Sequence, residues 1–159
     1  MLDPAPFLRK LFSVLDENGV DVLRSPLDHL CYRVENDERY QALRNALDRE
    51  GILLGENQIG GRPIATYRLN KPFLFDGRSI DVLELPAPKP GSPYQEGYEH
   101  AEFVVDEDLL AFIQRYPKLA WDISAIGKTI NADVRLRFEG YSVKLPRRAL
   151  AAELAADPD

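Results

Sequence analysis

The stretches "LDHLCYRVEND" (Leu27–Asp37) and "YEHAEFVVDED" (Tyr98–Asp108) share one pattern of residues. The chain has only two histidines, His29 and His100, and each of these stretches holds one of them. Alternation of polar and apolar residues indicates a β-strand, and the acidic residues that follow are typical of the first turn of a helix. The two stretches therefore predict two strand–helix units, each of which begins with a histidine-bearing strand.

The segments that follow the two stretches also correspond to each other. In the first half we expect a helix that ends near Glu50, followed by extended segments near residues 52–59, 63–70 and 79–86. In the second half we expect the helix "DEDLLAFIQRY", followed by extended segments near residues 119–126, 130–138 and 140–146. His29 corresponds to His100, a shift of 71 in position, and "DVLELP" (Asp81–Pro86) corresponds to "YSVKLP" (Tyr141–Pro146), a shift of 60. Two such landmarks per half predict an internal duplication, with about eleven residues lost from the second copy.

These elements predict an α+β protein in which two βαβββ modules form a curved eight-stranded mixed sheet around a cleft. The proline-rich "PAPKPGSP" can continue neither a helix nor an inner strand, so it predicts a connector between the modules. We expect one globular domain with these parts: an N-terminal helix (1–24), a first module (25–86), a connector (87–96), a second module (97–146) and a C-terminal helix (147–159).

Composition excludes several classes of partner. The 159 residues are 45% hydrophobic and carry a net charge of −6, which disfavours binding to nucleic acid or to an anionic membrane surface. No apolar run approaches the roughly 20 residues that a membrane span needs, and the N-terminus lacks the pattern of a signal peptide. The single cysteine, Cys31, cannot form an internal disulfide. We therefore expect a cytoplasmic protein that is a monomer or a homodimer.

Four positions carry the candidate chemistry. Side chains alternate along a strand, so His29 and His100 are expected on the open face of each module, away from the helices. Leu83 and Leu85 are expected to face the helices, which turns Glu84 to the open face, and Lys144 occupies the repeat-equivalent position of Glu84. If the modules face a common cleft, the four side chains converge. Two imidazoles and a carboxylate suit a divalent Zn, Fe, Mn, Ni or Co ion with open coordination positions.

Other interpretations of these residues remain open. A Glu84–Lys144 salt bridge would explain both charged positions without a metal ion. Beside a metal, Lys144 could instead act as a general base or bind an anionic oxygen. Arg62 and Arg68 could bind a carboxylate or phosphate of an anionic substrate.

Four phrases carry a resemblance to a known family: "LDHLCYRV", "GENQIGGRPI", "DVLELPAPK" and "YEHAEFVV". They are similar to the YecM-like family of the vicinal oxygen chelate superfamily, which includes glyoxalase I, extradiol dioxygenases and fosfomycin-resistance proteins. The resemblance covers about residues 25–146 and implies paired βαβββ modules around a metal site. In that superfamily the first strand of each module supplies a histidine or glutamine, and the last strand supplies a glutamate. His29, Glu84 and His100 match these roles, whereas Lys144 departs from the glyoxalase pattern, in which a second glutamate is ligand and base.

The resemblance leads to two hypotheses about function. The first is a metal-dependent enzyme (isomerase, lyase or dioxygenase) that acts on a small oxygen-chelating substrate. Lys144 weakens the dioxygenase option, because extradiol enzymes carry a glutamate ligand at that position. The alternative is a non-catalytic protein that binds or sequesters a small molecule, with Glu84–Lys144 as a structural salt bridge.

Overall fold

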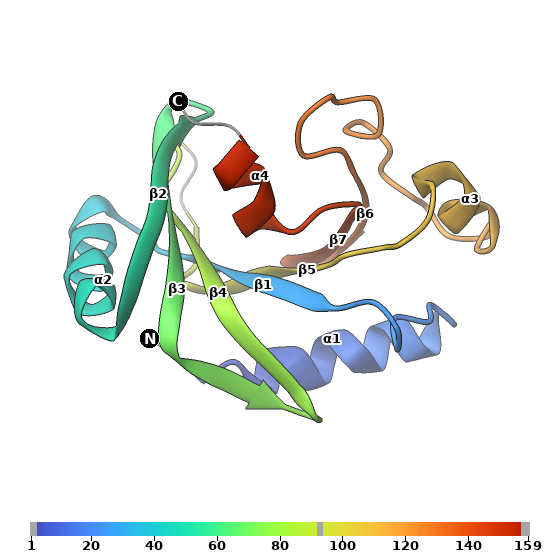
Figure 1. Cartoon of the computed structure of the whole chain (residues 1–159), viewed down its shortest axis with the longest axis horizontal. Coiled ribbons are helices and arrows are strands. Elements are labelled where there is room, and N and C mark those ends of the chain that lie inside the picture. Colours follow the sequence, from blue (N-terminus) through green and yellow to red (C-terminus); the bar gives the residue numbers. More distant parts are fainter. Residues whose placement is uncertain (1–2, 92–93, 157–159) are drawn as a thin grey trace. The chain divides into compact units, whose positions relative to one another are not determined.

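The computed structural model describes residues 3–91 and 94–156 of the chain (Figure 1). Residues 1–2, 92–93 and 157–159 lie outside the described residues, and with them the extreme ends of the expected terminal helices and part of the expected connector. The chain divides into two compact units. The first unit comprises residues 1–4 and 29–99, and the second comprises residues 5–28 and 100–159.

Among its described residues, the first unit contains four strands and one long helix. Its elements are β1 (Leu27–Arg33), α2 (Asp37–Glu50), β2 (Gly51–Ile59), β3 (Arg62–Phe75) and β4 (Arg78–Pro86). The strand order is β2-β3-β4-β1, in which β1 is parallel to β4 and the other neighbours are antiparallel. The residues of β1 that pair with β4, from His29 to Cys31, all belong to this unit. Helix α2 packs against β2 and β3 (Figure 1).

Helix α2 begins and ends where the sequence predicts. The side chain of Asn36 caps it by accepting a hydrogen bond from the backbone N–H of Arg39 at 2.9 Å. The chain leaves the helix at Gly51, which opens β2. The buried side chains of the helix follow its 3.6-residue period and are Tyr40, Leu43 and Leu47.

Side chains of β4 alternate between two environments, as expected. Leu83 and Leu85 are fully buried, and their register partners on β3, Tyr67 and Ala65, are fully buried too. Glu84 lies between these leucines and therefore points to the opposite face of the sheet. The prediction that Glu84 turns away from the leucines is confirmed within this unit.

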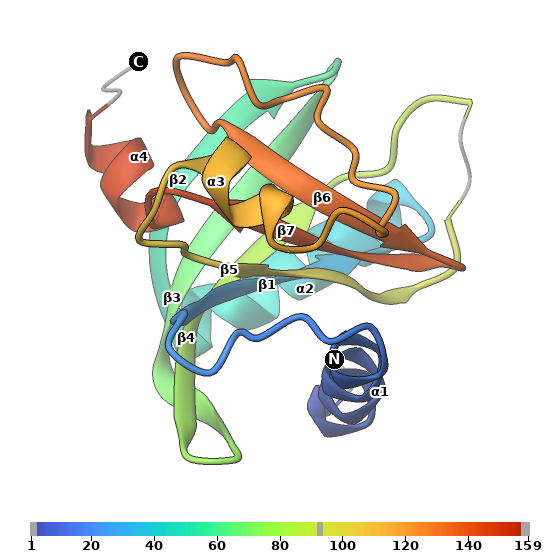
Figure 2. The ribbon, with the colours of Figure 1, turned by 90° about the vertical axis from the view of Figure 1, so that its right-hand side faces the viewer.

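The second unit contains three strands and three helices among the described residues (Figure 2). Its elements are α1 (Ala5–Glu17), β5 (Gly97–Phe103), α3 (Leu109–Gln114), β6 (Asp133–Phe138), β7 (Tyr141–Pro146) and α4 (Leu150–Ala156). The strand order is β5-β7-β6, with β5 parallel to β7 and β6 antiparallel to it. Helix α1 packs on β5 through an edge-to-face contact between Phe12 and Phe103, whose ring centroids are 5.6 Å apart. None of the described helices has the length and apolar character needed to cross a membrane.

The register of the strands reproduces the two shifts read from the sequence. In the first unit His29 pairs with Val82 and Cys31 pairs with Glu84. Adding 71 to the residue numbers on the first strand and 60 to those on the last strand predicts two pairs in the second unit, His100 with Ser142 and Glu102 with Lys144. These are the observed pairs of β5 and β7. The internal repeat is therefore present in the hydrogen-bonding register as well as in the sequence.

One expected strand is missing from the second unit. The segment near residues 119–126 forms only an isolated bridge, in which Asp122 and Arg135 exchange backbone hydrogen bonds of 2.8 and 3.0 Å. The Asp122 side chain bends the chain directly after this bridge by accepting hydrogen bonds from the backbone N–H and hydroxyl of Ser124. The described residues therefore form seven strands rather than the expected eight, in an α+β fold that otherwise agrees with the prediction.

The described end of the connector is held by the first unit. Glu96 accepts hydrogen bonds from the guanidinium of Arg39 at 3.0 and 2.9 Å and from the hydroxyl of Tyr32 at 3.1 Å. The hydrogen bonds from Arg39 are the main cause of the lowered pKa of Glu96. The connector thus returns to the N-terminal turn of α2 just before β5 begins.

Replacing Gly51 with alanine should destabilise the protein by about 1–3 kcal/mol, the cost typical of overpacking. A Cβ at this position would lie 2.4 Å from the backbone oxygen of Arg68, so the backbone of β3 would have to move. The free energy of unfolding is measured by chemical denaturation. Gly127→Ala is the control, because a Cβ there meets nothing within 4 Å. Equal stabilities of the two variants would contradict the close approach of β2 and β3.

Asp122→Asn should reduce stability at neutral pH and have little effect in acid. Hydrogen bonds from Ser124, and then from Arg137 at 3.0 Å, hold the pKa of Asp122 well below its usual range. A lowered pKa in the folded state contributes stability above the unfolded pKa of about 3.9, and this contribution is lost as the pH falls through the folded pKa.

Between pH 5 and 7 we expect Asp122→Asn to lower the free energy of unfolding by at most about 1 kcal/mol, because the Asp122–Arg137 pair lies at the surface. Below pH 4 we expect a smaller decrease. Denaturation curves at several pH values test this, with the exposed Asp106→Asn as the control. If the stability difference between the wild type and Asp122→Asn did not change with pH, the carboxylate charge of Asp122 would not contribute to stability.

Candidate functional site

His29 and Glu84 bring a nitrogen and an oxygen ligand together within the first unit. A ring nitrogen of His29 lies within 4.8 Å of a carboxylate oxygen of Glu84. The register explains this distance, because Glu84 pairs with Cys31, which lies two residues from His29 on the same face of β1. His29 is fully buried and Glu84 is half-buried. The pair offers one imidazole and one carboxylate to a divalent cation.

The neighbours of Glu84 are those on its own face of the sheet. Its register partners are Cys31 on β1 and the buried Thr66 on β3, and His29 lies close by. A half-buried carboxylate is stabilised by a cation or by hydrogen bonds that compensate its charge. Thr66 was not predicted from the sequence, although alternation along β3 places it on the face of Arg62 and Arg68.

The second unit carries the repeat-equivalent histidine, His100, beside a different carboxylate residue, Glu102. His100 is 3% exposed, and its Nε2 lies 3.7 Å from Oε1 of Glu102, a distance that allows an ion pair when the ring is protonated. A carboxylate close to a ligating histidine is a common means of orienting the ring. His100 therefore has the burial and the polar neighbour that a metal-binding histidine requires.

Lys144 stands in a row of charged residues across the second unit. Its register partners are Glu102 on β5 and Arg135 on β6. Lys144 is half-buried, and it forms no ion pair with the described residues of its own unit.

The two arginines predicted to bind substrate differ in their surroundings. Arg68 Nε lies 3.5 Å from the carboxylate of Asp81, and about half of its side chain is exposed. Arg62 is more enclosed, and its Nε is buried without a hydrogen-bond partner among the described residues. Both lie on the β3 face that carries Thr66.

Cys31 is buried, as expected for a small apolar residue. Its Sγ lies within 4.8 Å of a carboxylate oxygen of Glu99, a residue that was not predicted from the sequence. Glu99 also lies 3.7 Å from Nη2 of Arg33. This arginine compensates the charge of Glu99, so the cluster is explained without a ligand.

The other face of the first sheet carries a polar network that ties α2 to β2 and β3. The Tyr67 hydroxyl donates a hydrogen bond to Asp48 at 2.6 Å and accepts one from Arg44. The Tyr40 hydroxyl donates to Glu56 at 2.7 Å. Burial raises the pKa of Tyr67 to about 12 and also raises the pKa of Tyr40. Both phenols therefore remain protonated donors near neutral pH, as expected of a structural network.

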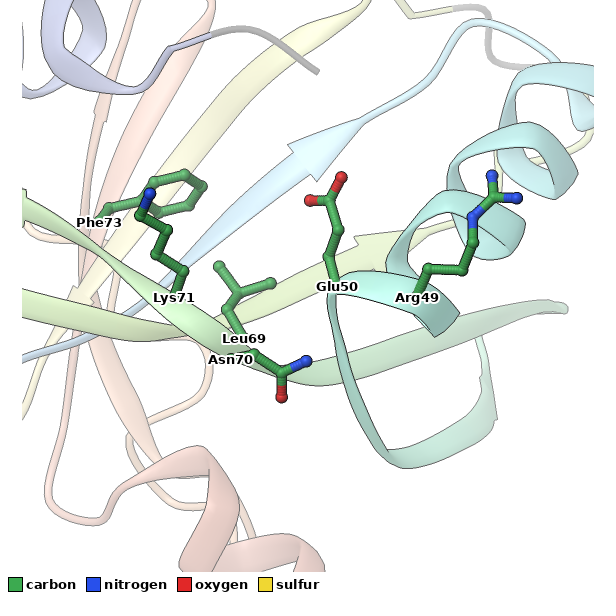
Figure 3. Close-up of a pocket in the computed structure, with 6 residues that line it drawn as sticks. All are labelled: Arg49, Glu50, Leu69, Asn70, Lys71 and Phe73. Atoms are coloured by element: carbon green, nitrogen blue, oxygen red, sulfur yellow. The ribbon is translucent and has the colours of Figure 1, made fainter.

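A cavity of about 280 Å³ lies at the end of α2 in the first unit (Figure 3). It opens where β3 loses its register with β4, between Arg68 and Phe73. Figure 3 shows Leu69 and Asn70 on opposite sides of β3, with Glu50 on the side of Leu69. The lining residues are Arg49, Glu50, Leu69, Asn70, Lys71 and Phe73. The cavity contains neither His29 nor Glu84, so it is separate from the candidate metal ligands, and it was not predicted from the sequence.

Comparison with known sequences gives one family and two relatives. A family model described as "YecM protein" matches residues 1–153. An uncharacterized protein of Haemophilus influenzae is 34% identical over 103 residues, which are 65% of this chain and 54% of that protein. Protein YecM of Escherichia coli is 31% identical over 110 residues, which are 67% of this chain and 58% of that protein. The matches thus span little more than half the length of these relatives.

Comparison with solved structures agrees with the fold. Protein EC4020, a structural genomics target, has a TM-score of 0.80 at 23% identity, and the match covers 96% of this chain and 87% of that one. The methylmalonyl-CoA epimerase of Streptomyces coelicolor, in complex with 2-nitronate-propionyl-CoA, has a TM-score of 0.50 at 17% identity. That match covers 76% of this chain and 95% of the epimerase. At such identities the likeness shows a common fold alone.

Proposed function

We propose that this chain, which belongs to the YecM family, is a divalent-metal-dependent enzyme acting on a small organic substrate with adjacent oxygen atoms. Its fold is that of the vicinal oxygen chelate superfamily. The observation that carries the proposal is the approach of His29 and Glu84 to within 4.8 Å in a buried part of the first unit. His100, the repeat equivalent of His29, is the proposed third ligand.

The donor set fits a transition metal. Two neutral imidazoles and one carboxylate suit Zn, Fe, Mn, Ni or Co, whereas Ca and Mg prefer sites made of oxygen alone. The register on both strands supports the assignment, since His29 and His100 occupy equivalent positions next to the last strand of each repeat. When bound, the ion would act as a Lewis acid that stabilises negative charge on the substrate oxygens.

Lys144 is the proposed catalytic group of the chain itself. It shares a sheet face with His100, because it pairs with Glu102, two residues further along β5. In the proposal a bound cation would favour the neutral amine of Lys144, and in this form Lys144 accepts a proton from the substrate. Arg62 and Arg68 bind an anionic group of the substrate. A lysine at the position where extradiol enzymes carry a glutamate ligand weakens the dioxygenase option.

Metal content tests the ligand assignment. Untagged protein incubated with Zn, Fe(II), Mn, Ni or Co in turn should retain about one ion per chain by elemental analysis. His29→Ala, Glu84→Ala and His100→Ala should each weaken retention at least tenfold, because each removes one ligand. Glu50→Ala, which removes an exposed glutamate of the first unit, is the control. Absence of binding for every ion, or unchanged binding in the three variants, would contradict the assignment.

Proton exchange tests the role of Lys144. Methylmalonyl-CoA is the first probe, because a protein of the same fold is an epimerase of this compound. In D₂O, the metal-loaded protein should exchange the C2 proton of methylmalonyl-CoA for deuterium, and NMR measures the rate of this exchange. Lys144→Met should lower the exchange rate at least a hundredfold while keeping its metal content.

Two other results would argue against this mechanism. Equal exchange rates in the wild type and Lys144→Met would exclude Lys144 as the base. Tight binding of the probe without exchange would favour the alternative function, a non-catalytic binding protein in which Glu84 and Lys144 form a salt bridge.

A further inference from the structure

The β2–β3 hairpin brings two cationic side chains together. Ile59 and Arg62 close a two-residue turn made of Gly60 and Gly61, both with left-handed φ angles, 61° and 80°. A Cβ placed on Gly60 would lie 3.3 Å from Nη1 of Arg62 and 3.9 Å from Nζ of Lys89. The guanidinium and the ammonium group therefore border the same small space above Gly60.

The position of Lys89 follows from the way the chain leaves β4. Pro86 pairs with Ile64, and the backbone N–H of Ala87 donates a hydrogen bond to the carbonyl of Pro63 at 2.9 Å. These contacts carry the chain past the end of β4 along the beginning of β3. Lys89, two residues after Ala87, thereby reaches the turn beside Arg62.

No acidic group of the described chain neutralises this pair. The protein has 26 acidic and 20 basic residues, yet neither Arg62 nor Lys89 forms an ion pair with any residue that the structure describes. Arg62 Nε is in addition buried without a hydrogen-bond acceptor from those residues. Two like charges so close together repel each other. An oxyanion between the two side chains would offset this repulsion.

We propose that Arg62 and Lys89 form a phosphate-binding site over Gly60. The two side chains together carry two positive charges, which match the charge of a phosphate group better than the single charge of a carboxylate. The guanidinium of Arg62 can donate two parallel hydrogen bonds to phosphate oxygens, and Lys89 adds a point charge. Gly60 contributes by having no side chain, because a Cβ would take up the space between the two cations.

The place of the site along β3 relates it to the proposed enzyme. Arg62 and Thr66 lie on one face of β3, and four residues of a strand span about 13 Å. Thr66 is the register partner of Glu84. If the proposed function holds, the site would bind a phosphate group of the substrate at about this distance from the reacting atoms. The site itself does not depend on the metal.

Titration of the metal-free protein with inorganic phosphate tests the site. The amide chemical shifts of Gly60 and Gly61, measured by NMR, should change as phosphate is added, and the change should saturate. Arg62→Gln and Lys89→Gln should each weaken the affinity at least tenfold, whereas Lys71→Gln, which removes an exposed positive charge elsewhere in the first unit, should leave it unchanged. Gly60→Asn should also weaken binding, because asparagine tolerates the left-handed turn but fills the space.

Three results would overturn the proposal. These are a shift that does not saturate, equal affinities in the wild type and the Arg62 and Lys89 variants, and succinate binding as tightly as phosphate. Because the titration uses metal-free protein, it gives its answer whether or not the metal site exists.

Discussion

The parallel pairing of the first and last strands of each repeat is the constraint on which the rest of the structure depends. It joins β1 to β4 and β5 to β7 with the same register, so that Cys31 faces Glu84 and Glu102 faces Lys144. Side chains alternate along each strand, so one set of positions is buried and apolar, and the other set carries the histidines and the charged residues. A slip of one residue would move the apolar set to the wrong face, and burial therefore holds the register in place.

The two units keep this register but differ in charge. Three repeat-equivalent positions on the same face carry different residues in the two units. The first unit has Glu84, Cys31 and Thr66 there, and the second has Lys144, Glu102 and Arg135, in the same order. Both units present a carboxylate near their histidine, Glu84 in the first and Glu102 in the second, and the second unit adds two cations in the same row.

Strand β3 combines several features of the first unit. Its first residue, Arg62, lies at the glycine turn with Lys89 nearby, and its middle carries Thr66 opposite Glu84. Further along, the register with β4 is lost between Arg68 and Phe73, and the cavity of Figure 3 opens there. The tyrosine network on its other face fixes β3 to α2. A strand held in this way can position polar side chains reproducibly on the face that carries Thr66.

The sequence by itself determined the repeat, the element order of the first unit and the face on which Glu84 lies, because these follow from alternation, capping and glycine turns, which are local. It did not predict the loss of the strand near residues 119–126, because the turn at Asp122 depends on contacts with Ser124, Arg135 and Arg137. Only the tertiary structure decided that Asp81 pairs with Arg68 and that Lys89 reaches Arg62. Each of these contacts joins residues well separated in the chain, and their distances follow from strand register and chain path, which no local pattern encodes.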